Sequence, residues 1–407
     1  MEQIYLDHNA TTPIHPEVVQ AMDRCYAQGY ANPASQHRPG QEAYRVLQDA
    51  RERIAEILGA DLTSTAPDRL VFTASGTEAN NLAVLGIARA GNDKVCEGDS
   101  SIFPAGKSRP SPSDHSASPK LVISAIEHAS VIEPAESLLE KGWRVDTLGV
   151  TPDGVVRVEQ LPDLLDQQAR LVSVQLGNHE TGALQPVADL ARICRDAGVP
   201  LHSDAVQAAG KLAVNFRDLG VAAMTIGAHK FGGPLGIGAL ILSDDVQIEP
   251  LIYGGHQQSG LWPGTESIAL AAGMLTALEI WHNDRENHMR HLSGLRDRFE
   301  NGLKAGFPRL LVNGAGSQRL PQTSNLGFPG LDGQILLMAL DTAGVACSVG
   351  SACSSGSTEL SPTLRAMDLP PEVVGSSLRF SLGETTTEAE VDEAVARILQ
   401  VCKELQP

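Results

Sequence analysis

Apolar residues along this chain form short, nearly unbroken runs that alternate with longer segments in which they recur at helical spacing. The runs are too short for helices and are bounded by turn residues, which indicates buried β-strands. They lie at residues 69–73 (RLVFT), 121–124, 143–148, 171–175 (LVSVQ), 199–203, 224–227 and 237–242. Helical spacing appears at residues 16–30, 40–58, from about 78 onward, and at 127–141, 158–166 and 187–197. This alternation predicts a mostly parallel, seven-stranded sheet between helices.

A second, smaller α/β unit is predicted toward the end of the chain. A long helix at residues 267–286 leads into it, followed by helices at 290–304, 333–343 and 387–404 and strands at 324–327 and 378–381. We therefore expect a large domain at residues 15–262 and a small domain made of residues 1–14 and 263–407. Residues 96–119 are rich in Ser, Pro, Gly and Asp without apolar periodicity, which predicts a flexible surface insertion.

Composition narrows the class of protein. Of the 407 residues, 42% are hydrophobic and 20% are charged, as in an ordinary soluble globular protein. The net charge of −18 argues against nucleic acid or an anionic membrane as a partner. No apolar stretch approaches the roughly 18 residues of a membrane span, and residues 1–4 show no secretory signal, so we expect a cytoplasmic protein. Cysteines without C-x-x-C spacing predict reduced thiols and no metal site.

Several chemically useful residues come directly after predicted strands. In an open parallel sheet the ligand lies at the carboxyl ends of the strands, so residues in this position share one edge. We expect one site there, built from Gly76, Thr77, His128, Asn178, Asp204, Gln207 and Lys230.

The residue types at this edge suit pyridoxal phosphate. Lys230, in the segment MTIGAHKFGGPLGIG, is able to form an imine with an aldehyde, although a surface lysine in a glycine-rich turn has the same pattern. The turn at Gly76 and Thr77 precedes a helix and suits a phosphate, or is a plain strand-to-helix turn. Asp204 would keep the pyridine nitrogen protonated, or would cap a helix. His128 would stack on the ring, or would be a capping or surface histidine.

Two further side chains extend this site. Gln207 would bond the ring oxygen or face solvent, and His229 would contact the phosphate or lie in the core.

The loop VACSVGSACSSGST, at residues 345–358, carries a candidate nucleophile. Cys353 lies among small residues, which predicts an exposed and reactive thiol; the alternative is a passive one. Cys347 follows apolar residues and is expected to be packed. Arg379, in the strand LRFSL, would bind a substrate carboxylate or form a structural ion pair.

Ordered motifs along the chain resemble one known family. YLDHNATTP, FTASGTEANN, IEHASV, DAVQAAGK, HKFGGPLGIGAL, GTES, VGSACSSGS and LRFSLG are similar to segments of the group I cysteine desulfurases, within the class V aminotransferase superfamily. These are pyridoxal phosphate enzymes of fold type I. The resemblance runs from residue 4 to about residue 400, and only residues 96–119 have no counterpart.

The resemblance implies a role for each matching position around the cofactor. Lys230 would hold pyridoxal phosphate covalently, and Asp204 and Gln207 would contact its pyridine nitrogen and ring oxygen. His128 resembles the stacking and acid–base histidine. The phosphate contacts would come from Gly76, Thr77, His229 and, in the neighbouring subunit, Thr265. The last of these implies a homodimer.

The resemblance also implies a substrate and a product. Arg379, Asn9 and Asn178 match positions around the substrate, which would be L-cysteine. Cys353 resembles the nucleophile that takes its sulfur, leaving alanine and a persulfide for a sulfur acceptor or scaffold protein in iron–sulfur cluster assembly or thio-modification. No resident metal is implied, although Cys353 could ligate an iron–sulfur cluster transiently in a complex.

Some positions depart from the family pattern. His179 stands where the family commonly has the second Asn of N-N-E-T-G, and its imidazole would still donate one hydrogen bond to the cofactor. Gly227 stands where the family has a phosphate-binding serine, and Ser259 and Trp262 replace the usual arginines. We expect an active enzyme with altered phosphate contacts. The competing hypotheses are a selenocysteine lyase or another class V aminotransferase-type enzyme, and a non-catalytic binding subunit.

Overall fold

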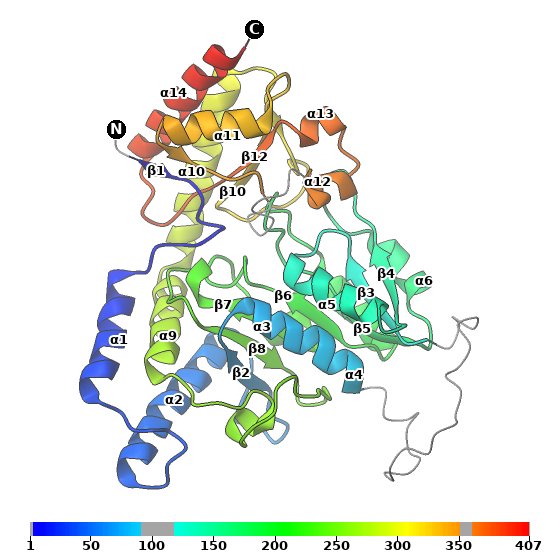
Figure 1. Ribbon diagram of the computed structural model, residues 1–407, viewed down its shortest axis with the longest axis vertical. Coiled ribbons are helices and arrows are strands. Elements are labelled where there is room, and N and C mark those ends of the chain that lie inside the picture. Colours follow the sequence, from blue (N-terminus) through cyan, green and yellow to red (C-terminus); the bar gives the residue numbers. More distant parts are fainter. Residues whose placement is uncertain (1–2, 91–117, 351–359, 407) are drawn as a thin grey trace.

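The computed structural model describes residues 3–90, 118–350 and 360–406 (Figure 1). Its strands are β1 Ile4–Tyr5, β2 Arg69–Thr73, β3 Lys120–Ser124, β4 Arg144–Leu148, β5 Ala169–Ser173, β6 Leu201–Asp204, β7 Ala223–Gly227, β8 Gly238–Leu242, β9 Leu311–Val312, β10 Thr323–Gly327, β11 Val345–Ala346 and β12 Ser377–Ser381.

The helices occupy most of the remaining described chain. They are α1 Pro16–Gln28, α2 Arg38–Ile57, α3 Gly76–Asn81, α4 Ala88–Ala90, α5 Ala129–Leu139, α6 Leu161–Leu164, α7 Val187–Asp196, α8 Phe216–Leu219, α9 Ile268–Asn283, α10 Arg285–Gly306, α11 Gly333–Thr342, α12 Pro362–Ala366, α13 Pro371–Val374 and α14 Glu388–Leu405. A π-helical turn, η1 Leu82–Ile87, joins α3 to α4, and 3-10 turns lie at η4 Val158–Gln160, η5 Ala228–Lys230 and η6 Gln257–Gly260. None of the helices in the described ranges is long and apolar enough to cross a bilayer.

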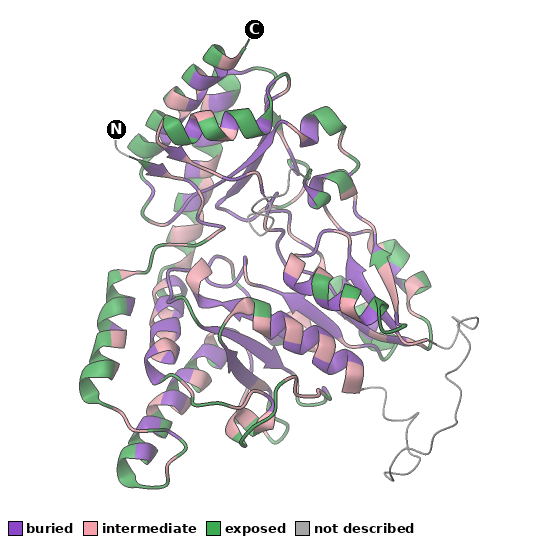
Figure 2. Ribbon diagram, in the orientation of Figure 1, coloured by how far each residue is buried: buried purple, intermediate pink, exposed green. Residues whose placement is uncertain are grey.

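The described residues contain a seven-stranded sheet in the order β2-β8-β7-β6-β5-β3-β4. The pairs from β7 through β4 are parallel, whereas β8 runs antiparallel to both β7 and β2. The predicted α/β class with a mostly parallel seven-stranded sheet is therefore confirmed. Figure 2 shows most strands of this sheet buried, with the edge strand β4 only partly so, and the outer sides of α1 and α2 exposed.

Successive strand residues point into two separate cores, because side chains alternate between the faces of a sheet. In β3, Leu121 and Ile123 pack into the core that contains residues of α3 and α5, whereas Val122 belongs to the core on the other face, with α7. Both faces are covered, which explains why the strands read as continuous apolar runs in the sequence.

A smaller sheet lies beside the large one. The order β12-β10-β9 is antiparallel, and β1 pairs in parallel with β11. Helix α14 packs against α10 and α11, and its first turn is held by a capping box in which Thr387 and Glu390 bond each other's backbone N–H. The predicted domain boundaries stay a prediction; α9, which follows the second boundary, packs against α1 and α2.

Most predicted elements match the observed ones within a few residues. One difference has a clear cause: instead of a helix at residues 158–166, the chain forms η4 and then the short α6. Pro162 has no N–H to donate to the Val158 carbonyl, whereas it is tolerated in the first turn of a helix, and α6 accordingly begins at Leu161. The predicted insertion at residues 96–119 falls almost wholly outside the described residues.

Close packing at Gly383 holds the start of the chain in place. A Cβ added at this glycine would lie 2.0 Å from Cε1 of the buried His8. We predict that Gly383→Ala displaces the segment around His8 and lowers the free energy of unfolding by about 1–3 kcal/mol, the usual cost of overpacking. Urea denaturation checks this. Gly294→Ala, on an open face of α10 with nothing within 4 Å, is the control and should be neutral or slightly stabilising; equal stability of the two variants would contradict the prediction.

Candidate active site

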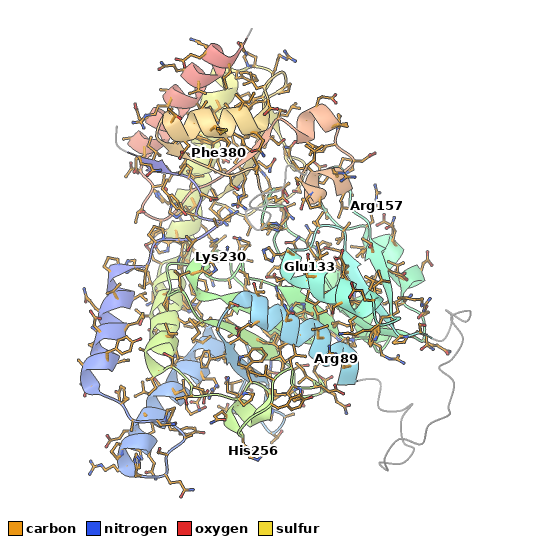
Figure 3. All side chains as sticks on the ribbon, in the orientation of Figure 1. Arg89, Glu133, Arg157, Lys230, His256 and Phe380 are labelled. Carbon is orange, nitrogen blue, oxygen red and sulfur yellow. The ribbon has the colours of Figure 1, made fainter. Side chains whose placement is uncertain are left out.

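Lys230 is the last residue of the turn η5, which directly follows β7. Its Nζ donates hydrogen bonds to the backbone oxygens of Asn9 (2.6 Å) and Ala10 (2.8 Å). Thr12 Oγ1 donates in turn to the Lys230 carbonyl at 3.1 Å. Figure 3 shows Lys230 on the side of the large sheet that faces β10 and β12. The N-terminal segment thus holds this amine at the predicted edge of the sheet, and Lys230 is not a surface turn residue.

Asp204 ends the neighbouring strand β6 and is nearly buried. Its Oδ1 accepts a hydrogen bond from the Val206 N–H at 2.9 Å, and its Oδ2 accepts one from Asn80 Nδ2 at 2.7 Å. These bonds fix the orientation of a carboxylate at this edge. Sequence reasoning missed Asn80, although it belongs to the FTASGTEANN motif.

His128 is the N-cap of α5, so the capping alternative describes one of its roles. Its Nδ1 accepts a hydrogen bond from the Ser130 N–H at 3.1 Å and lies 2.7 Å from Ser130 Oγ. The ring packs edge-to-face against His179, with ring centroids 5.3 Å apart. The cap places the imidazole at the same edge as Asp204 without any contribution from a ligand.

His179 is a mostly buried, neutral ring. Burial lowers its pKa well below the usual value, and the nearby basic side chains of His128, Arg379 and Lys230 act in the same direction. Its Nδ1 is buried and has no hydrogen-bond partner in the described part of the chain. An orphaned ring nitrogen at a site is a candidate contact for a bound group.

Gln207 and Lys211 form a second layer at the same edge. Gln207 Nε2 donates to the Asn9 carbonyl at 3.0 Å, and its Oε1 accepts from Lys211 Nζ at 3.2 Å. Burial lowers the pKa of Lys211 well below its usual value, and Lys230 and Arg379 add to this effect. Lys211 orients the amide of Gln207. Sequence reasoning missed it, although it ends the motif DAVQAAGK and a lysine is an unusual residue to bury.

The predicted phosphate turn is formed at the start of α3. Ser75 caps the helix by accepting from the Glu78 N–H at 3.2 Å, which leaves the first N–H groups, at Gly76 and Thr77, without intrahelical partners. A Cβ at Gly76 would lie 2.9 Å from Val206 Cγ2, so the turn needs glycine there. Gly227 is different: its φ is −141° and a Cβ would have only ordinary contacts.

His229 lies two residues after Gly227 in the sequence. Its side chain contacts the N-terminal segment. Its Nδ1 lies 3.1 Å from Thr11 Oγ1. Burial lowers its pKa to about 4, with Lys230 and Lys211 contributing. The ring is therefore neutral at physiological pH.

Arg379 is buried on β12 and forms the structural ion pair that was one of its two predicted roles; substrate binding stays a prediction. Its Nη2 forms an ion pair with Asp7 at 2.7 Å, and its Nη1 donates to the carbonyls of His179 and Gly350, each at 3.1 Å. Its Nε is buried without a partner among the described residues. The guanidinium therefore lies at the site with one donor unused.

The two asparagines predicted around the substrate are bonded within the protein. Asn9 Nδ2 donates to Thr323 Oγ1 at 2.9 Å and to the His179 carbonyl at 3.2 Å. Asn178 Oδ1 accepts from the N–H groups of Glu180 and Thr181 at 3.0 and 2.8 Å. Both amides stabilise the loop around His179, and direct substrate binding by them stays a prediction.

Cys353 lies outside the described residues, but the chain on either side of that segment is held at the site. Gly350, three positions before Cys353, is bonded to Arg379. Ser361 Oγ donates to Glu180 Oε2 at 2.6 Å, and burial raises the pKa of this glutamate. Cys347 is packed as predicted, and burial raises the pKa of its thiol to about 12, which makes it a poor nucleophile.

Thr265 lies apart from Lys230, in an exposed position. It lines a cavity of about 220 Å³ with Phe72, Gly236 and Trp262. The Trp262 side chain is partly buried against the core under α3, and Ser259 has a left-handed backbone with φ 59°. An exposed threonine at this place is compatible with reaching a second subunit.

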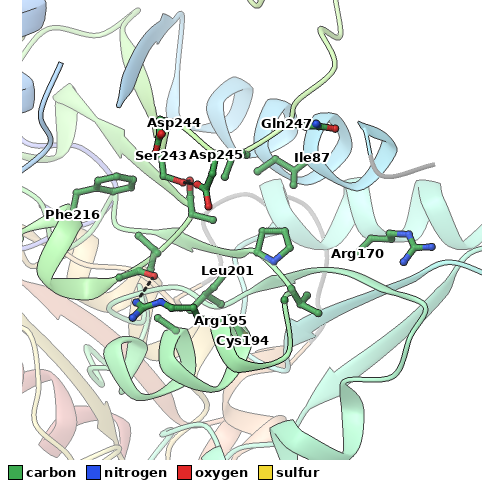
Figure 4. A pocket seen from close by; sticks show the side chains of 18 of the residues that line it. Ile87, Arg170, Cys194, Arg195, Leu201, Phe216, Ser243, Asp244, Asp245 and Gln247 are labelled. Carbon is green, nitrogen blue, oxygen red and sulfur yellow. Dashed lines mark hydrogen bonds between the residues drawn. The ribbon is translucent and has the colours of Figure 1, made fainter. Parts of the chain in front are cut away.

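A wide cavity of about 960 Å³ lies at the opposite edge of the sheet (Figure 4). Residues at or just before the amino ends of β5, β6 and β7 line it, among them Ala169, Leu201 and Ala222, with Arg195 and Asp245 at the side. None of the predicted site residues in the described chain belongs to it, so the size of this cavity does not mark the candidate site.

Known proteins resemble the chain along nearly its whole length. The model of the family described as Aminotransferase class-V matches residues 4–103 and 112–394. An IscS-like cysteine desulfurase from Mycobacterium tuberculosis is 38% identical over 96% of this chain and 94% of its own length. A solved NifS-like protein has a TM-score of 0.86 at 30% identity and covers 99% of this chain and 100% of its own. A structure named SspA in complex with cysteine has a TM-score of 0.73 at 25% identity, over 94% and 99%.

Glu127, next to His128, is a buried carboxyl group that sequence reasoning missed. It accepts hydrogen bonds from the Ser124 hydroxyl and, at 2.9 Å, from the Gln175 N–H. Burial raises its pKa from 4.5 to about 8, and Asp204 contributes in the same direction. Glu127 is therefore mostly protonated at pH 7.

This raised pKa predicts a pH-dependent stability. Between about pH 4.5 and 8 the folded Glu127 keeps a proton that the unfolded chain releases, so its contribution to the free energy of unfolding falls as pH rises, by about 1.4 kcal/mol per unit. Glu127→Gln mimics the protonated acid and should flatten that slope. Urea unfolding at pH 5.5, 6.5 and 7.5 measures it; parallel slopes for the two proteins would refute the assignment.

Proposed function

Because the chain belongs to the class-V aminotransferase family, and relatives that match it from end to end are named cysteine desulfurases, we propose that it is a cysteine desulfurase. Members of this family depend in general on pyridoxal 5′-phosphate, and we propose the same cofactor here. One observation carries the proposal: Lys230, Asp204 and His128, from distant parts of the sequence, lie at the carboxyl edge of the large sheet, and Arg379 on β12 bonds the His179 carbonyl in a loop of that sheet.

The residues present fit this cofactor. Lys230 supplies an amine that backbone carbonyls hold in place, and Asp204 supplies a fixed carboxylate. The side chain missing at Gly76 leaves the amide groups of the helix start accessible. When bound, the cofactor withdraws electrons from the amino-acid carbons.

Each cofactor contact follows from the position of a side chain. Lys230 would hold the aldehyde carbon, Asp204 the pyridine nitrogen and Gln207 the ring oxygen. His128 and His179 would flank the ring, edge-to-face with each other. The phosphate would lie against the residues around the α3 turn, which are Gly76, Thr77, His229 and, from a second subunit, Thr265. This last contact makes the proposed enzyme a homodimer.

The chain's own groups also supply the reaction on L-cysteine. The Arg379 guanidinium would bind the substrate carboxylate. Lys230 and His128 hold and move protons at the amino acid. The Cys353 thiolate attacks the substrate sulfur, so that the C–S bond breaks, an S–S bond forms and the carbon gains a proton. The products are alanine and a persulfide on Cys353, which a cytoplasmic sulfur-acceptor or scaffold protein would then take for iron–sulfur clusters or thio-modification.

His179, Ser259 and Trp262 differ from the residues that the family usually has at these positions. A selenocysteine lyase is therefore a second candidate function. It would use the same lysine and carboxylate but would not depend on Cys353 as a persulfide carrier. Comparing L-cysteine and L-selenocysteine as substrates separates the two. Retention of the lysine, the acid and the arginine around one site argues against a non-catalytic subunit.

Replacing the proposed nucleophile tests the function directly. Cys353→Ser should lower alanine formation from L-cysteine at least about 100-fold, because a covalent nucleophile has no substitute. Mass spectrometry of the wild-type protein after L-cysteine should find one additional sulfur on Cys353. Cys25→Ser, on α1 and away from the site, is the control and should keep full activity. Wild-type turnover by Cys353→Ser would exclude the persulfide route.

Because there is open space at Gly227, we predict that Gly227→Ser raises the affinity for the cofactor. A serine fits the extended backbone there, and its Cβ would lie 3.9 Å from the Gly76 nitrogen, beside the phosphate turn. One added hydrogen bond to a charged group contributes about 1.5–3 kcal/mol, so Gly227→Ser should bind pyridoxal phosphate at least about tenfold more tightly. Titration of the apoprotein, followed by absorbance, measures this. Gly76→Ala, which would crowd Val206, should bind it more weakly; a serine variant with unchanged affinity would place the phosphate elsewhere.

A further inference from the structure

Four side chains form a continuous line of hydrogen bonds from Asp204 to His128. Asp204 Oδ2 is 2.7 Å from Asn80 Nδ2, which is 2.8 Å from Ser130 Oγ. Ser130 Oγ is 2.7 Å from His128 Nδ1. Asn80 and Ser130 are both buried, with exposed fractions of 1% and 7%. The line joins the end of β6 to α3 and to the start of α5.

The chemistry of these groups fixes the direction of each bond. An ionised carboxylate only accepts, so the Asn80 amide must turn its NH₂ group toward Asp204, and the same nitrogen donates its second hydrogen to Ser130. The Ser130 hydroxyl therefore accepts from Asn80 and is left to donate its own hydrogen. The atom at 2.7 Å that can receive it is His128 Nδ1.

A second donor confirms the state of that nitrogen. The Ser130 backbone N–H, which cannot accept, also points at His128 Nδ1 from 3.1 Å. With two donors directed at it, Nδ1 carries no proton. The ring therefore carries its proton on Nε2, and protonation at Nδ1 would require the Ser130 hydroxyl to turn and the α5 cap to break.

We propose that Ser130 is a positioning residue that fixes the tautomer of His128, with the proton on Nε2, and that it couples this ring to Asp204 through Asn80. Proton exchange between His128 and a substrate would then take place at Nε2. The carboxylate proposed for the cofactor nitrogen and the histidine proposed for proton transfer belong to one polar network, which a change at Asn80 or Ser130 would disturb at both ends.

Nitrogen NMR on the holoenzyme tests this assignment. In protein labelled with ¹⁵N-histidine, the signals that disappear in His128→Gln identify the ring. The wild type should show Nδ1 as an imine-type nitrogen and Nε2 as the protonated one. In Ser130→Ala, Nδ1 loses one donor, and its resonance should move toward that of an unbonded imine nitrogen, whereas Ser130→Thr, which keeps the hydroxyl, should restore the wild-type position.

Kinetics supply a second readout. Ser130→Ala should lower kcat on L-cysteine about fivefold, as expected for one hydrogen bond, with KM unchanged and with rescue by Ser130→Thr. The change in kcat rests on the proposed function, whereas the nitrogen spectrum does not, so an inactive enzyme would still give a valid spectrum.

A protonated Nδ1 in the wild type, or an Nδ1 resonance that does not move in Ser130→Ala, would overturn the assignment. If Ser130→Ala does not fold, Ser130→Cys, whose thiol is a weaker donor, replaces it with the same expected direction.

Discussion

The backbone of residues 7–12 is the contact on which the site depends. The carbonyl of Asn9 accepts hydrogen bonds from both Lys230 and Gln207, two groups that come from different loops of the large sheet. The same segment pairs with β12 through Ser381 and bonds Thr323 on β10. This one segment, which turns at residues 8–10, therefore fixes the lysine and connects the large sheet to the small one. Any displacement of residues 7–12 would therefore move both the lysine and the connection between the two sheets.

Electrostatics at the site follow from burial. Lys230, Lys211 and Arg379 lie close enough for their charges to affect one another, and the pKa of Lys211 is lowered accordingly. His179 and His229 stay neutral because burial and this basic surrounding oppose a further positive charge. The site as a whole favours anions. A phosphate group and an amino-acid carboxylate, the two anions of the proposed reaction, suit such a site better than any cation would.

The departures from the family pattern are local and leave the framework intact. At Gly227 a hydroxyl is missing, yet the backbone is extended and the space remains. At His179 a bulkier ring replaces an asparagine, and it packs against His128 while its carbonyl still accepts from Arg379 and Asn9. The scaffold that holds the lysine, the carboxylate and the arginine is thus independent of these two side chains. Their effect should be on binding strength more than on the type of chemistry.

The sequence by itself predicted most of the strands and helices, because apolar runs and turn residues act locally, and it placed the candidate site residues after strands whose carboxyl ends share one edge. It also pointed to Lys230, Asp204, His128 and Arg379, through their positions and through resemblance. Only the tertiary structure decided that Asn9 and Asn178 are bonded within the protein, that Lys211 and Glu127 are buried beside the site, and that Asn80 and Ser130 join Asp204 to His128. These contacts join residues far apart in the chain, and no local pattern of hydrophobicity encodes a hydrogen bond between distant side chains.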